Sequence, residues 1–195
     1  MHKKRLFYFG IVSIVVLTTA IVNSPFGYAE QPENSPYATQ LDSPIRGLSA
    51  QQVDDLLKGR GAGYARMAEL NSYPGPRHIL DLQQHLSLSP SQVQQIEVVF
   101  EQMQADAKRL GQNIVEREQQ LSTAFASGEI NHAEMQAQTE ELGKLYSQLR
   151  ATHLQAHLQI KPLLEPEQIA NYNKLRGYTS TPEQSMPTHH QQHSH

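Results

Sequence analysis

The chain contains neither cysteine nor tryptophan, and aromatic residues make up only 7% of its 195 positions. Without cysteine there can be no disulfide bond, no thiolate metal ligand and no cysteine nucleophile. With so few aromatic side chains, a large and deeply packed core is not expected. Stability must therefore come from helix packing or from association with a partner subunit.

Strand patterns and an excess of positive charge are also missing. Between residues 48 and 176, valine and isoleucine are few and never alternate with polar residues over a strand's length, which predicts an all-α fold. The chain has 16 basic and 19 acidic residues. A mildly acidic surface argues against nucleic acid as the partner.

The N-terminus has the layout of a secretory signal peptide over residues 1–29. Three cations at residues 3–5 precede an apolar run over 6–22, and small residues at Gly27 and Ala29 form a cleavage pattern. We predict cleavage after Ala29 and export to the periplasm. Loss of the three cations leaves 13 basic against 19 acidic residues, a net charge of about −6. The alternative is an uncleaved anchor, although the run is slightly short for a span of about 20 residues.

Two polar segments with several prolines flank the helical region. Their composition, rich in Gln, Asn, Ser and Asp or in His, is typical of disordered chain. We predict a disordered linker over 30–47 and a disordered His-rich tail over 177–195. Between them we expect a short helical extension over 48–75 and a helical hairpin domain over 76–176.

Three helix starts share one pattern. Leu48–Gln52 and Leu88–Gln92 both read Leu-Ser-x-x-Gln, and Leu164–Gln168 has Glu in place of Ser. This spacing predicts a capping box, in which the Ser hydroxyl accepts from the third helical amide and the Gln side chain reaches back to the cap amide. Pro90 and Pro166 then occupy the first helical position, where a missing N–H costs nothing.

Two long helices follow from the apolar periodicity. Apolar residues recur at 3–4 spacing over 90–126 and again over 132–160. Between them, Gly128 is expected to end the first helix and Asn131 to cap the second. So short a connection makes the two helices antiparallel neighbours.

Shorter helices are predicted over 49–58, 64–71, 76–86 and 166–176. The segment Gly59–Gly63, between the first two, resembles a phosphate loop only superficially, since no strand precedes it and the spacing differs. We expect it to break the helix and redirect the chain.

The chain has two Leu-x-x-x-Gln helix starts that flank a long hairpin, and it begins with an export signal. In these features it resembles the Spy/CpxP family of Leu-Thr-x-x-Gln proteins. That family includes the zinc-resistance-associated protein and periplasmic heavy-metal sensors. Leu88–Gln92 and Leu164–Gln168 match the motif, with Ser89 and Glu165 replacing Thr, and the resemblance covers 76–176. It implies two hairpin subunits paired as a curved homodimer with no catalytic centre. It also implies an ATP-independent chaperone, an accessory protein of stress signalling or a metal sensor.

Histidines on the helices form one candidate metal site. His153 and His157 are four residues apart and so share a helix face. Pairing the long helices about their turn places His153 level with Asp106, and the fold-back of helix 76–86 brings His78 toward His157. Imidazoles with a carboxylate suit zinc, copper, nickel or cobalt. The metal-sensing relatives carry a His-x-x-x-Met pair where this chain has His153-x-x-x-His157. The alternative is that these histidines are ordinary helix residues hydrogen-bonded to carboxylates.

A second candidate metal site lies in the tail. Its members are His189, His190, His193 and His195. In a flexible chain such spacings bind zinc, copper or nickel without selectivity. No cofactor is required by either site.

Catalytic motifs are absent from the sequence. Serines fall mainly in caps and linkers, and His132-Ala133-Glu134 does not complete a His-Glu-x-x-His motif. We therefore expect a non-enzymatic protein with one of two functions. The first is a chaperone-like module that binds unfolded envelope proteins. The alternative is a heavy-metal sensor or metal-resistance accessory that acts with a membrane sensor protein.

Overall fold

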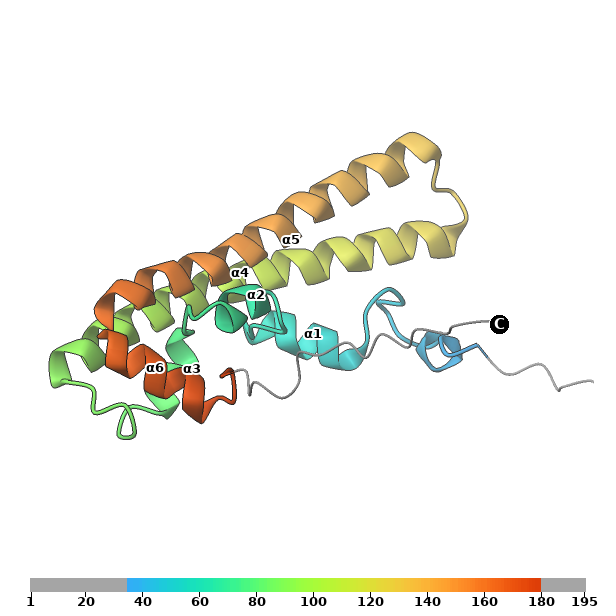
Figure 1. The fold of residues 1–195 in the computed structure, drawn as a ribbon. Coiled ribbons are helices and arrows are strands. Elements are labelled where there is room, and N and C mark those ends of the chain that lie inside the picture. Colours follow the sequence, from blue (N-terminus) through green and yellow to red (C-terminus); the bar gives the residue numbers. More distant parts are fainter. Residues whose placement is uncertain (1–34, 180–195) are drawn as a thin grey trace, which may run out of the picture. The chain divides into compact units, whose positions relative to one another are not determined.

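The computed structural model describes residues 35–179, and the predicted all-α class with a long antiparallel hairpin and short flanking helices is confirmed there (Figure 1). The signal peptide, its cleavage site and the tail histidines lie outside these residues. The elements of residues 35–179 are, in chain order, η1 (Ala38–Gln40), α1 (Ala50–Leu57), α2 (Arg66–Leu70), α3 (Pro76–Asp81), α4 (Pro90–Ser127), α5 (His132–Ile160), η2 (Lys161–Leu163) and α6 (Pro166–Leu175).

The predicted capping boxes begin α1 and α4. The hydroxyls of Ser49 and Ser89 each accept a hydrogen bond from the amide of a glutamine three residues later, at 3.2 Å. The side chains of Gln52 and Gln92 in turn accept from the two cap amides, at 2.8 and 2.9 Å. Local hydrogen bonding thus sets where these helices start.

The hairpin turn also follows the prediction. Gly128 ends α4 in the left-handed conformation, with φ 72°. Asn131 caps α5 by accepting a hydrogen bond from the Glu134 amide at 3.0 Å. The two long helices run back along each other from this turn (Figure 1).

Two apolar clusters form the core. The first core cluster joins residues before and within α1 to the middle of the hairpin: Ile45, Leu48, Leu56, Ala107, Leu110, Ile114, Leu142 and Leu149. The second core cluster joins α3 and α6 to the open ends of α4 and α5: Ile79, Leu86, Ile96, Ile160, Leu164 and Tyr172. The short helices therefore act as a second layer on one part of the hairpin.

A reciprocal amide pair ties the two family-like motifs together. Gln92 Nε2 donates to Gln168 Oε1 at 2.8 Å, and Gln168 Nε2 donates to Gln92 Oε1 at 3.2 Å. Gln92 Nε2 also reaches the Leu163 carbonyl at 2.8 Å. Because Gln168 Oε1 accepts from the Glu165 amide at 2.9 Å, each glutamine caps its own helix and binds the other helix start.

Extension helix α1 packs against α4 at the level of the backbone. A Cβ atom added at Gly111 would overlap the carbonyl of Leu56. One added at Gly59, which has φ +62°, would lie 3.0 Å from the Gln104 carbonyl oxygen. Two glycines therefore permit the end of α1 and the loop after it to lie directly on α4.

Three predicted boundaries are corrected by the structure. Part of the expected linker is ordered, since Ile45 is buried in the first core cluster and the Arg46 amide donates to Ser122 Oγ at 3.3 Å. Similarly, Tyr178 of the expected tail packs against the second core cluster. Composition averages over a segment and so missed these single buried side chains. Finally, α3 ends at Asp81 rather than at 86, and turns replace its last part.

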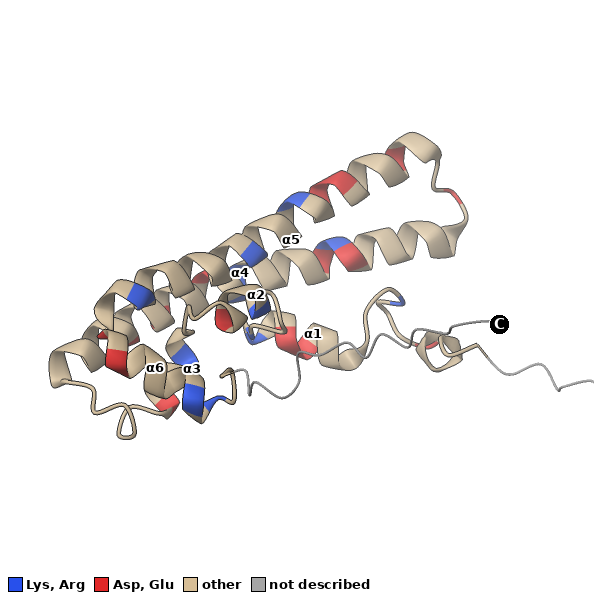
Figure 2. Ribbon diagram, viewed as in Figure 1, with Lys and Arg blue, Asp and Glu red and all other residues tan. Residues whose placement is uncertain are grey.

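Charged residues of both signs are spread over the two long helices (Figure 2). Among the described residues, none of the helices is both long enough and apolar enough to cross a membrane.

The backbone contact at Gly111 can be tested with a matched pair of substitutions. Gly143→Ala places a methyl group in open space and should stabilise α5 by about 0.5–1 kcal/mol. Gly111→Ala should instead lower the free energy of unfolding by about 1–3 kcal/mol, because the methyl group forces α1 away from α4. Urea unfolding followed by circular dichroism measures both values. Equal stabilisation by the two substitutions would contradict the packing described.

The glutamine pair makes a second stability prediction. Gln92→Ala should cost about 1–3 kcal/mol, since it leaves the partly buried Gln168 amide and Leu163 carbonyl without this hydrogen-bond partner. Exposed Gln95, which bonds only Ser91 Oγ, is the control, and Gln95→Ala should change stability by less than about 0.5 kcal/mol. The double variant Gln92→Ala/Gln168→Ala should lose less unfolding free energy than the two single variants lose together. Strict additivity of the two would rule out a direct interaction.

Candidate functional site

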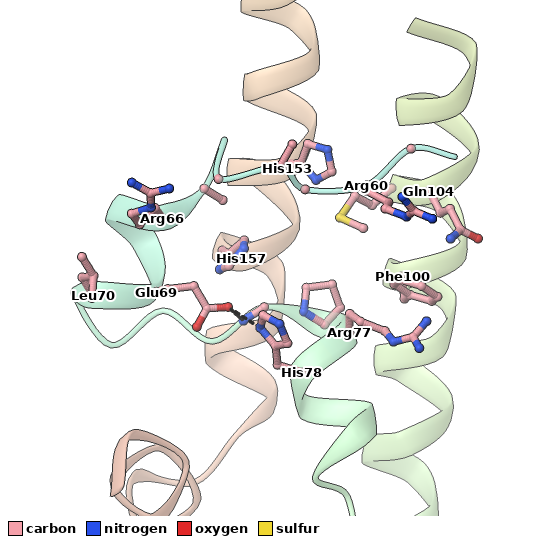
Figure 3. Close-up of a pocket in the computed structure, with 18 of the residues that line it drawn as sticks. Arg60, Arg66, Glu69, Leu70, Arg77, His78, Phe100, Gln104, His153 and His157 are labelled. Carbon is pink, nitrogen blue, oxygen red and sulfur yellow. Dashed lines mark hydrogen bonds and ion pairs between the residues drawn. The ribbon is translucent and has the colours of Figure 1, made fainter. Parts of the chain in front are cut away.

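A cavity of about 530 Å³ lies between the two core clusters (Figure 3). On α4 it is lined by Phe100, Met103 and Gln104, which fall between Ile96 of one cluster and Ala107 of the other. The other walls come from α2, α3, α5 and the loop between α1 and α2. We call this cavity the central pocket.

A buried carboxylate organises one wall of the central pocket. Glu69 of α2 is only 8% exposed. Its Oε1 lies 3.0 Å from His78 Nδ1 (Figure 3) and accepts from the Gly75 amide at 3.2 Å. Its Oε2 accepts from the Tyr172 hydroxyl at 2.6 Å. Glu69 thereby connects α2 with α3 and α6. Burial alone would raise the pKa of this carboxyl. The hydrogen bonds from His78 and Tyr172, with the charges of His78 and His157, outweigh burial and hold the pKa below its usual value.

His157 stands on the α5 wall beside this carboxylate. Its Nδ1 lies 2.7 Å from the Tyr73 carbonyl oxygen. A carbonyl only accepts hydrogen bonds, so Nδ1 is the nitrogen that carries a proton and donates. A Cβ atom added at Gly75 would lie 2.8 Å from both Glu69 Oε1 and His157 Cε1, which explains why glycine occupies that position.

His153, one turn earlier on α5, is 3% exposed. Its ring stacks on Tyr64 with centroids 5.9 Å apart and planes 6° apart. Its Nε2 is buried and has no hydrogen-bond partner among the described residues. Burial first, and then the charge of His157, lowers the pKa of His153 from 6.5 to about 4. The ring is therefore neutral at physiological pH.

The structure brings together three of the four helix residues predicted for a metal site. His78, His153 and His157 all line the central pocket, but Asp106 does not. The Asp106 carboxylate is held along the surface of α4 by Gln102 at 2.8 Å and Arg109 at 3.2 Å. Pairing the helices about their turn places residues along the axis but does not say which way each side chain points.

The carboxylate that meets these histidines is Glu69, which the sequence did not reveal. No sequence signal could have found it, because its position depends on how the extension folds onto the hairpin. Within residues 35–179, no three His, Asp or Glu side chains are arranged to hold a metal ion. The tail candidates His189, His190, His193 and His195 lie outside the described residues.

These features define a class of helical hairpin protein whose two Gln-capped helix starts are bonded to each other. The chain belongs to the LTXXQ motif family, whose model matches residues 75–176. This family includes the Spy/CpxP-type periplasmic proteins and is non-enzymatic, so the predicted resemblance is confirmed. Among curated proteins and solved structures, no significant match is found. Glu69 and Tyr64 lie before the matched region.

His153 predicts acid sensitivity of the fold. Because its pKa is about 4 in the folded state and 6.5 ordinarily, the unfolded chain binds a proton first as the pH falls. The stability due to neutral His153 is complete above pH 6.5 and is lost progressively toward pH 4, by roughly 3 kcal/mol in all. Glu69, whose pKa is lowered, adds acid sensitivity below its ordinary pKa of 4.5.

Replacement of His153 tests this assignment. His153→Phe keeps the ring stacked on Tyr64 and removes the titrating group, so unfolding free energy should vary less between pH 7 and pH 5. His132→Phe, at the exposed start of α5, should leave the slope unchanged. Urea unfolding at several pH values gives the slopes, and an unaltered slope in His153→Phe would refute the prediction.

Proposed function

We propose that this protein is a periplasmic stress protein of the Spy/CpxP type that holds unfolded envelope proteins on the far half of its hairpin. The far half comprises residues 115–141, next to the connecting turn. The main support for this proposal is that α4 and α5 extend through residues 115–141 although none of these residues is buried. The extension and α6 cover the other half, whereas the far half is contacted by the segment before α1, whose Arg46 amide donates to Ser122 Oγ at 3.3 Å.

The far half combines apolar and charged groups. Val115, Leu121, Ile130 and Met135 are only half-buried, and Phe125 is 59% exposed. An ion pair between Arg117 and Glu141, at 2.9 Å, lies among them. Small apolar patches separated by charge support weak and reversible binding of unfolded segments rather than tight binding of one partner.

A homodimer is part of this proposal. Two helices without a third layer leave their shared apolar seam partly exposed to water. A second copy packed against part of the hairpin would cover some of this surface and would leave a curved face for clients. Membership of the LTXXQ motif family supports this arrangement.

The second candidate function is a metal sensor or metal-resistance accessory that binds zinc, copper or nickel and signals to a membrane sensor protein. It is favoured by the meeting of His78, His157 and Glu69 at one wall of the central pocket. Their present hydrogen bonds oppose it, since the Nδ1 atoms of His78 and His157 already bind Glu69 and the Tyr73 carbonyl. Metal would have to use the Nε2 atoms or displace these bonds.

Aggregation of reduced lysozyme measures the proposed chaperone activity. The mature chain should delay aggregation, and Phe125→Ser should weaken this protection roughly two- to fivefold, because an apolar contact with the client is lost. Leu158→Ser is the matched control, since Leu158 is 61% exposed but lies outside the far half. Equal loss in both variants, or no protection by the mature chain, would contradict the proposal.

Calorimetric titration with zinc, copper and nickel separates the two functions. The protein is the mature chain with its four tail histidines replaced by Ala. Micromolar binding that is abolished by His157→Ala, in a protein that does not suppress aggregation, would favour the sensor. Protection without metal binding would favour the chaperone.

A further inference from the structure

The central pocket collects positive charge in a chain whose overall charge is negative. Arg60, Arg66 and Arg77 line it from the loop after α1, from α2 and from α3, and His78, His153 and His157 add imidazoles (Figure 3). Helix α4 contributes no charge to the lining. Glu69 is the single carboxylate of the lining, and its oxygens are already engaged by three hydrogen-bonding groups.

The three arginines differ in how far they are neutralised. Arg60 is paired with Asp54 and Asp55, both at 2.7 Å, and Arg77 with Asp81 at 3.1 Å. Arg66 has no carboxylate partner within residues 35–179. A Cβ atom added at Gly63 would lie 3.0 Å from Arg66 Nη2, so this guanidinium sits against the glycine-rich loop at the pocket. Among the described residues, Arg66 is thus a cation of the pocket lining without a carboxylate partner.

His153 adds a buried polar atom that is unsatisfied. Its Nε2 has no partner among the described residues, although the side chain is almost fully buried and lines the same pocket. Native proteins rarely leave such an atom unpaired unless a ligand or water completes it. In the Nε2–H tautomer this neutral ring is a hydrogen-bond donor.

The opposite wall of the pocket carries two apolar side chains beside Gln104. Phe100 and Met103 of α4 face it, and the guanidinium of Arg77 lies 5.8 Å above the Phe100 ring. A flat apolar body can stack on Phe100, and the flexible side chain of Met103 adapts to its shape. Cavities with apolar walls and a few convergent polar groups are the usual binding sites of small molecules.

We propose that the central pocket binds a small organic oxyanion. Its oxygens accept hydrogen bonds from Arg66 and from His153 Nε2–H, and its apolar body packs on Phe100 and Met103. This site goes beyond the proposed function, because it lies outside the far half of the hairpin and needs neither clients nor metal.

Calorimetric titration of the full mature chain in the presence of EDTA tests the site. The probes are phenyl phosphate, benzoate, inorganic phosphate and phenol. Phenyl phosphate or benzoate should bind with a stoichiometry of one, inorganic phosphate more weakly, and phenol not measurably, since it lacks the oxyanion. Binding by only one of the two aromatic anions identifies the head group. Added sodium chloride should weaken binding.

Matched variants locate the binding. Arg66→Gln and His153→Phe should each weaken it by about tenfold, the usual effect of removing one hydrogen bond to an anion. Arg117→Gln, on the far half, should leave it unchanged. Arg66 is exposed, so its variant keeps the fold even if His153→Phe does not. Nitrogen NMR of His153 should show Nε2 protonated and shifted by the ligand.

Three results would overturn the inference: no binding at millimolar anion, equal binding of phenol, or equal weakening by Arg117→Gln. Loss of lysozyme protection in Phe125→Ser has no bearing on these titrations. The proposal of an oxyanion site and the proposal of a chaperone function can therefore be refuted independently of each other.

Discussion

The reciprocal hydrogen bonds between Gln92 and Gln168 are the constraint on which the rest of the structure depends. Each glutamine completes a helix cap and also bonds the other helix start, so α4 and α6 are held together at their first turns. One turn along α6, Tyr172 then reaches Glu69, and Glu69 holds α2 and α3. A local capping motif thereby becomes a tertiary connection, which gives a physical reason for a glutamine at the fifth motif position.

The extension over residues 48–75 divides the hairpin into two parts with different chemistry. Where α1 lies on α4 at Gly111, the hairpin gains a core and the walls of the central pocket. Beyond Ile114 the segment before α1 still contacts α4 at Ser122, but no residue over 115–141 is buried and the apolar seam stays half open. A protein with one buried half and one half that stays partly exposed can keep a stable fold and still offer a surface for weak binding.

The covered half contains two buried ionisable side chains, Glu69 and His153, whose pKa values are both lowered in the folded state. A carboxylate with three hydrogen-bonding partners and a neutral buried imidazole both favour the folded state above their transitions. Among the described residues, His153 Nε2 has no hydrogen-bond partner and Arg66 no carboxylate partner, and both side chains line the central pocket. Stability and ligand binding would therefore draw on the same few side chains, whereas client binding would use others.

Sequence by itself determined the helices, because their ends are decided by hydrogen bonds between residues three or four apart: the box of Ser89 and Gln92, the left-handed Gly128 and the cap at Asn131. It also predicted that the fold-back of α3 brings His78 toward His157, and both residues line the central pocket. Only the tertiary structure decided that Glu69 joins them, that Asp106 turns away and that Ile45 is buried. Helical periodicity defines the face on which a residue lies and its position along the axis of its own helix. Which distant segment covers that face depends on packing among all the elements, which no local pattern encodes.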